Sequence, residues 1–127
     1  MRLFTVVSLF AFSLITPAVA HHSFEAEYDG SRTATITGIV TKVDWVNPHA
    51  YIFINAKDES GAAKSIRIEL GPPYALVRGG WKKDSVKIGD QITVEGGALP
   101  RDARNNWVGA MQTTELITAS GGKLPMR

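Results

Sequence analysis

The sequence predicts a mainly β protein, a partly open OB-like barrel of five strands with one short helix. Five runs rich in β-branched and aromatic residues are separated by turns that contain glycine, proline, aspartate or asparagine. These runs cover residues 33–46, 51–55, 64–70, 91–95 and 107–117. A short helix-forming segment around Ala75 lies between the third and fourth runs, which is the element order of the OB-fold. An open sandwich of the same strands is the alternative.

The first two runs carry irregular patterns. In the first run, Ile36 is the inward candidate before Gly38, whereas after the glycine the alternation starts at Ile39 and is shifted by one residue. Such a shift predicts a β-bulge at the glycine. The second run, residues 51–55, is continuously apolar, which predicts burial on both faces.

The remaining elements follow simpler signals. The third run alternates, with Ile66, Ile68 and Leu70 facing the core. Prolines at 72–73 are suited to the first turn of the helix, and Gly79 and Gly80 end it. The predicted core residues are Ile36, Val43, Ile54, Ile66, Ile68, Ile92 and Val94. We expect an exposed loop from Gly96 to Asn106 and a flexible, glycine-containing tail over 119–127.

The first 20 residues have the pattern of a cleavable secretory signal peptide. Arg2 supplies a positive charge, residues 3–15 are mostly apolar, and Ala18 and Ala20 stand where signal peptidase requires small residues. The apolar run is shorter than a membrane-spanning helix and is followed by Pro17, so we expect no stable membrane anchor after cleavage. The predicted organisation is a signal peptide over 1–20, an extended arm over 21–32, a β domain over 33–118 and the tail. The protein is expected in the periplasm or secreted.

Composition narrows the functions that this chain can have. It contains no cysteine, so disulfides, lipid anchoring through cysteine, thiol catalysis and cysteine-based zinc sites are excluded. Lysine and arginine number 14 against 12 acidic residues, a balance that gives no argument for nucleic acid as a partner. The chain is long enough for one hydrophobic core and too short for two domains.

The three histidines give the sharpest chemical hypothesis. Cleavage after Ala20 would leave a free α-amine on His21, and that amine and its own imidazole can chelate a metal together. His22 follows directly, and His49 lies in the Asn47-Pro48-His49 connection between the first two strands. An amine with two imidazoles forms a T-shaped nitrogen set, which suits Cu(II). The arrangement is similar to the histidine brace of copper monooxygenases and periplasmic copper carriers, although an N-terminal His-His that binds nothing is the simpler interpretation.

Other polar residues carry weaker signals. Four carboxylates could neighbour the histidines but are interpreted as solvated or turn-capping groups, namely Glu25, Asp29, Asp44 and Glu69. The aromatic residues Trp45, Tyr51, Phe53 and Trp107 could form a stacking face, with core packing as the simpler interpretation. Cationic residues flank Trp81, at Arg78, Lys82 and Lys83. They are interpreted as a solvated patch, with a small anion site as the alternative.

Several motifs together resemble a known family. They are Ala20-His21-His22-Ser23-Phe24, the segment 38–45 with Asn47-Pro48-His49, Glu69-Leu70, Gly80-Trp81 and the segment 85–96. This combination resembles a family of short exported bacterial proteins that is catalogued as a domain of unknown function. The resemblance implies an exported small domain and carries over no activity, substrate or catalytic residue.

From these observations we predict a small exported binding module with copper as its candidate ligand, held by His21, His22 and His49. The alternative is a non-catalytic OB-like adaptor of the periplasm that docks a partner protein through a strand edge or its aromatic face. An oxidative copper enzyme ranks third, because the sequence shows no residues that would organise a substrate.

Overall fold

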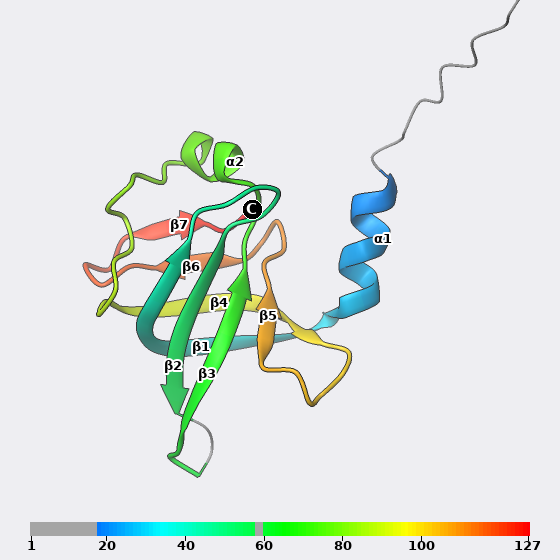
Figure 1. Cartoon of the computed structure of the whole chain (residues 1–127), viewed down its shortest axis with the longest axis horizontal. Helices are drawn as coiled ribbons and strands as arrows, with labels where there is room; N and C mark the ends of the chain where they lie inside the picture. The colour runs from blue at the N-terminus through cyan, green and yellow to red at the C-terminus, as the bar shows by residue number, and fades with distance from the viewer. Residues whose placement is uncertain (1–17, 58–59) are drawn as a thin grey trace, which may run out of the picture.

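The elements of the fold are taken from a computed structural model, which describes the backbone of residues 18–57 and 60–127 and the side chains of residues 23–57 and 60–127 (Figure 1). The predicted signal peptide lies largely outside the described residues. In chain order the elements are α1 (Ala18–Glu27), β1 (Tyr28–Asp44), β2 (Tyr51–Lys57), β3 (Ala63–Glu69), α2 (Pro73–Arg78), β4 (Gln91–Pro100), β5 (Trp107–Gly109), β6 (Glu115–Ile117) and β7 (Lys123–Pro125).

The long strand β1 closes the sheet into a barrel. It pairs antiparallel with β2 along one edge and with β4 along the other. The sheet runs β1-β2-β3-β5-β4, with β3 and β5 parallel, and the β1–β4 pairing completes the ring. This closed, mixed barrel of five strands confirms the predicted mainly β, OB-like fold, and the barrel is closed rather than partly open. Strands β6 and β7 extend the sheet beyond β4.

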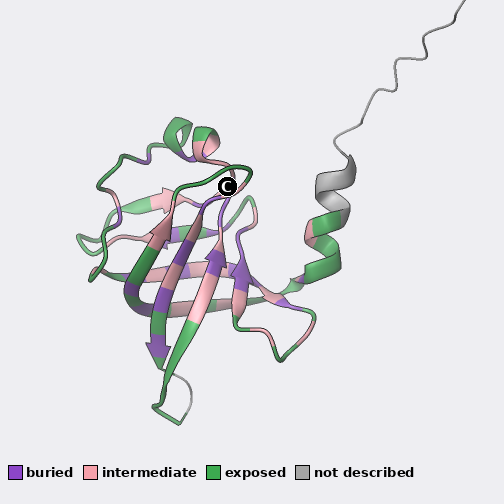
Figure 2. Cartoon of the chain, viewed as in Figure 1, coloured by how far each residue is buried: buried purple, intermediate pink, exposed green. Residues whose placement is uncertain are grey.

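The core fills the barrel and is formed by aliphatic residues from every wall (Figure 2). Of the predicted core residues, Ile54, Ile68, Ile92 and Val94 are fully buried. Ile36, Val43 and Ile66 are partly buried and pack against this cluster. Helix α2 begins at Pro73 as expected and places the buried Leu76 over one end of the barrel.

The predicted bulge at Gly38 was misplaced. The register of β1 against β2 shifts between Val40 and Lys42, so the inward side chains are Val40 and Val43, and Ile39 is exposed. Gly38 has a different role: a Cβ there would lie 2.6 Å from the Asn55 carbonyl oxygen. Glycine is therefore required because β2 approaches closely, whereas the extra residue that bends the strand sits further along.

The second and fourth strands also differ from expectation. In β2 only Ile52, Ile54 and Ala56 are buried, because the other face of this strand lies on the half-exposed outside of the barrel. β4 continues through Gly96 and Gly97 to Pro100, where an exposed loop was predicted. At Gly97 a Cβ would lie 2.2 Å from Val108, so the glycine lets β4 run tightly across β5. The predicted fifth strand, residues 107–117, is divided into β5 and β6 by a turn.

Both ends of the described chain are more ordered than predicted. Residues 18–27 form α1, so the expectation of an extended arm is wrong for residues 21–27, whereas residues 28–32 are extended as the start of β1. Alanines and glutamates in this segment are strong helix formers, which explains the helix. The tail over 119–127 is not flexible, because β7 pairs with β6 and Met126 is fully buried. No helix in residues 18–57 and 60–127 has the length and apolar character needed to cross a bilayer.

Candidate functional site

His49 lies in the connection from β1 to β2, where the Asn47–Pro48 peptide bond is cis. The residue after it, Ala50, is buried and fixed by its backbone: its N–H donates to the Gly71 carbonyl at 3.1 Å, and its carbonyl accepts from Leu70 at 2.9 Å. Because Leu70 directly follows β3, these two bonds hold His49 beside the end of that strand. The conformation of the β1–β2 loop therefore determines which side chain the His49 imidazole contacts.

That neighbour is Glu69, the last residue of β3. Its Oε1 lies 2.7 Å from His49 Nδ1, and its Oε2 accepts a 2.7 Å hydrogen bond from the Tyr28 hydroxyl. An ionised carboxylate only accepts hydrogen bonds, so Nδ1 of His49 carries the proton in this contact. In the neutral imidazole the lone pair then lies on Nε2, the nitrogen that remains for another partner.

The cluster of Tyr28, His49 and Glu69 is shielded from solvent to different degrees. Tyr28 is 1% exposed, whereas the side chains of Glu69 and His49 are 15% and 29% exposed. Burial raises the pKa of the Tyr28 hydroxyl far above its usual value, and the hydrogen bond to Glu69 and its negative charge raise the pKa further, against an opposing effect of Arg67. Burial also raises the pKa of Tyr51, assisted by the charge of Glu69. The tyrosine hydroxyls therefore remain protonated, and the histidine is the most solvent-exposed member of the cluster.

Arg67 supplies a positive charge next to this cluster. Its guanidinium lies 4.2 Å from the centre of the Trp107 ring and 5.3 Å from that of Tyr51. Both rings belong to strands that pair with β3, so the cation is held between them on the outer face of the barrel. The predicted aromatic stacking face is thus occupied in part by an arginine of the same chain.

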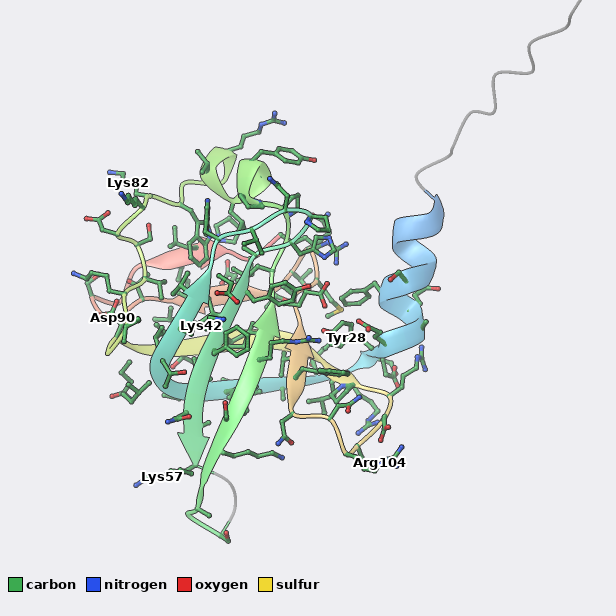
Figure 3. The ribbon with its side chains drawn as sticks, in the orientation of Figure 1. Tyr28, Lys42, Lys57, Lys82, Asp90 and Arg104 are labelled. Carbon is green, nitrogen blue, oxygen red and sulfur yellow. The ribbon has the colours of Figure 1, made fainter. Side chains whose placement is uncertain are left out.

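The C-terminal end of α1 is fixed close to the cluster. The Phe24 ring lies 4.8 Å from the Tyr28 ring, and the Arg127 guanidinium lies 5.1 Å from Phe24. Both rings lie against Gly109, where a Cβ would meet each of them at 2.8 Å, so β5 needs glycine at this position. Figure 3 shows Tyr28 between the barrel and the foot of α1.

The three predicted metal ligands are placed unequally. The structure places His49 next to a carboxylate. His21 and His22 lie in the backbone of α1, and their side chains are outside the described residues. Among the side chains that are described, no group of three histidine, cysteine or acidic residues could hold a metal. The geometry between the N-terminal histidines and His49 therefore stays a prediction.

Of the four carboxylates considered from the sequence, one joins the cluster. Glu69 contacts His49, whereas Asp44 pairs with Lys42 at 2.9 Å and Asp29 accepts hydrogen bonds from Ser31, which lower its pKa. Glu25 is exposed. The interpretation of Glu69 as a solvated or turn-capping group was wrong, because it hydrogen-bonds to His49 and Tyr28. These contacts could not be foreseen from the sequence, since the partners lie 20 and 41 residues away.

Tyr28 was not recognised as a functional residue in the sequence. It stands four residues after Phe24 in a polar segment, and that isolation among polar residues is the signal that could have identified it. A buried tyrosine usually finds a hydrogen-bond partner for its hydroxyl, and here that partner is Glu69.

These features define a class: a small OB-like barrel whose β1–β2 loop presents a histidine oriented by a partly buried carboxylate, which is itself held by a buried tyrosine. Residues 10–107 match the model of a family described as a family of unknown function (DUF6152). The chain belongs to that family. Comparison with curated proteins and with solved structures gave no significant match.

Proposed function

We propose that this protein, after export and cleavage behind Ala20, is a periplasmic copper-binding module. The ligands are the α-amine and imidazole of His21 with the imidazole of His49, and His22 is an additional candidate. These ligands lie in the His-His-Ser-Phe and Asn-Pro-His motifs, two of the motifs on which the family resemblance rests.

The observation that supports the proposal most strongly is the pairing of His49 with Glu69. Metal-binding histidines usually donate their other ring N–H to a carboxylate or carbonyl, which fixes the tautomer and makes the free nitrogen a better ligand. The 2.7 Å contact between Nδ1 and Glu69 Oε1 has this form and leaves Nε2 for a metal. Tyr28 holds the second carboxylate oxygen, so the orientation of Glu69 is fixed as well.

The chain also offers a way for the new N-terminus to approach His49. Cleavage would shorten α1 to residues 21–27, well below the roughly 12 residues that an isolated helix needs for stability. Phe24 would still hold this short segment against Tyr28. The residues before Phe24 can then rearrange next to the cluster, which a brace between His21 and His49 requires.

Copper binding by the mature chain tests the proposal directly. The protein should be exported with its own leader, checked by mass spectrometry to start at His21, and titrated with Cu(II). We expect one bound ion with tetragonal electron paramagnetic resonance parameters and several nitrogen ligands. Replacing His49 by alanine should weaken binding strongly, whereas in a chain with one glycine added before His21 the new terminus chelates copper by itself, and binding should no longer depend on His49.

A matched control is Asp102→Asn, because among the described residues the Asp102 carboxylate pairs with Arg104, in its own loop. It should leave copper binding unchanged. Equal binding by the native chain and the His49→Ala variant would contradict the proposal. An N-terminal residue other than His21 would also remove the brace, and the adaptor interpretation would then be preferred.

A further inference from the structure

A groove separate from the histidine cluster lies between the β1–β2 loop and the segment that follows α2. It has a volume of about 410 Å³ and is lined by Trp45, Val77, Lys82 and Lys83. Small-molecule sites commonly have volumes of about 300–1,000 Å³ and mostly apolar walls, with a few polar groups that orient the ligand. The size and lining of this groove fit that description.

The apolar side chains that line the groove are exposed to solvent, and one of them, Trp45, packs against a buried residue. Trp45 is 43% exposed and packs its ring 5.9 Å from the ring of Trp81. Trp81 is buried, and its Nε1 donates a 2.6 Å hydrogen bond to the Pro125 carbonyl, which fixes it against β7. Val77, which also lines the groove, is 58% exposed. Large apolar side chains held in place but left in water are typical of a surface that binds something.

The charged side chains at the groove have one sign. Lys82 and Lys83 both line it, and within the described part of the chain neither forms an ion pair. The Lys82 N–H donates to Ser85 Oγ at 2.8 Å, which fixes the turn that carries the two lysines. The described lining contains no carboxylate. Of the acidic residues next to the lining residues in sequence, Asp84 lines a different depression with Ser85 and Lys87, and Asp44 pairs with Lys42 at 2.9 Å.

We propose that this groove binds a free amphiphilic carboxylate, with its aliphatic or aromatic body against Trp45 and Val77 and its carboxylate at Lys82 and Lys83. Charge complementarity selects the anion, because two lysines that form no ion pair with any described residue line an otherwise apolar concavity. The concave shape favours a single molecule over the surface of a bilayer, which would require protruding side chains. This inference does not depend on the copper proposal, since it uses none of the histidines.

Binding of decanoate below its micelle concentration tests the proposal. We expect a saturable change in tryptophan fluorescence that disappears in the Trp45→Phe variant, and amide shifts in NMR spectra centred on residues 45, 77 and 82–83. Reversing both charges, in Lys82→Glu/Lys83→Glu, should weaken binding about tenfold or more, because two attractive charge pairs become repulsive. Decanol, which lacks the charge, should bind as weakly as decanoate binds to the reversed variant.

A matched control reverses two lysines at the far end of the barrel, Lys57→Glu/Lys64→Glu. These residues lie in the β2–β3 hairpin, and Figure 3 shows Lys57 and Lys82 at opposite ends of the molecule. This control should bind decanoate like the parent. Equal weakening in both double variants, no saturable binding, or binding only to phosphatidylglycerol vesicles would each overturn the proposal.

Discussion

Replacing Glu69 by glutamine removes one charge and changes the shape of the side chain very little, so it isolates the role of the carboxylate. Glu69 accepts hydrogen bonds from Tyr28 and His49, both at 2.7 Å. A glutamine has one accepting oxygen and one donating amide, so it cannot accept from both partners through separate atoms. Because hydrogen bonds to charged groups contribute about 1.5–3 kcal/mol, we expect the free energy of unfolding to fall by about that amount. The side chain is 15% exposed, so solvent reduces this figure only slightly.

Two measurements on the metal-free protein test this expectation. Urea unfolding of the parent, Glu69→Gln, Tyr28→Phe and the double variant gives the coupling between residues 28 and 69, which should be about 1 kcal/mol or more. Nitrogen-15 NMR of the imidazole should show the proton of neutral His49 on Nδ1 in the parent, and a shift towards the Nε2–H tautomer in Glu69→Gln. Copper affinity, measured against a competing chelator, should fall about 10- to 100-fold in the same variant.

Glu115→Gln is the control, because Glu115 is an exposed carboxylate that pairs with Lys123 at 3.2 Å. It should change the free energy of unfolding by less than about 0.5 kcal/mol. The reasoning would be refuted if both variants had the same stability and His49 kept the same tautomer without the carboxylate. A lowered stability with unchanged copper affinity would instead refute only the metal site.

Two further predictions concern the barrel. Ile68 is fully buried between Ile52 and Val108, so Ile68→Ala should lower the free energy of unfolding by about 2–5 kcal/mol, and a variant that melts within about two degrees of the parent would contradict the packing. Because the pKa of Tyr28 is raised in the folded state, the unfolded chain binds fewer protons above about pH 10, and stability should fall there by up to about 1.4 kcal/mol per pH unit. Tyr28→Phe should show a smaller slope, and equal slopes would contradict this assignment.

The barrel could be predicted from the sequence because its strands carry local signals. Ile66, Ile68 and Leu70 alternate as a strand with one buried face should, and the helix is bounded by prolines and glycines. The inward and outward faces of β1 could not be assigned from the sequence. The strand has a bulge next to Thr41 and a close approach of β2 at Gly38, and these two irregularities lie within a few residues of each other. A sequence does not distinguish a glycine that makes room for a neighbouring strand from one that bends its own.

The site was predictable only in part. His49 was identified from its chemistry, because histidines are rare in this chain. Its contact with Glu69 joins a loop to the end of another strand, and the contact of Glu69 with Tyr28 joins residues 41 positions apart. Such pairs depend on how the strands close into a barrel, which no periodicity within one segment reveals. The same closure explains why Glu69, on the outer face of β3, is nonetheless shielded.

The attachment of α1 decides which variant tests the copper proposal most cleanly. The Glu27 carbonyl accepts a hydrogen bond from the Arg101 N–H at 2.9 Å, and Phe24 packs on Tyr28, so the chain just before β1 is fixed to the barrel from two directions. A substitution of His21 removes its imidazole and leaves its amine, so it does not test whether the amine itself is a ligand. A glycine placed before His21 keeps every side chain and both anchors, and converts the amine of His21 into an amide. The glycine brings its own amine, which can chelate copper together with the histidines at the terminus, so copper bound by that variant should no longer depend on His49. An equal loss of affinity on His49→Ala in the native and the extended chains would contradict the brace.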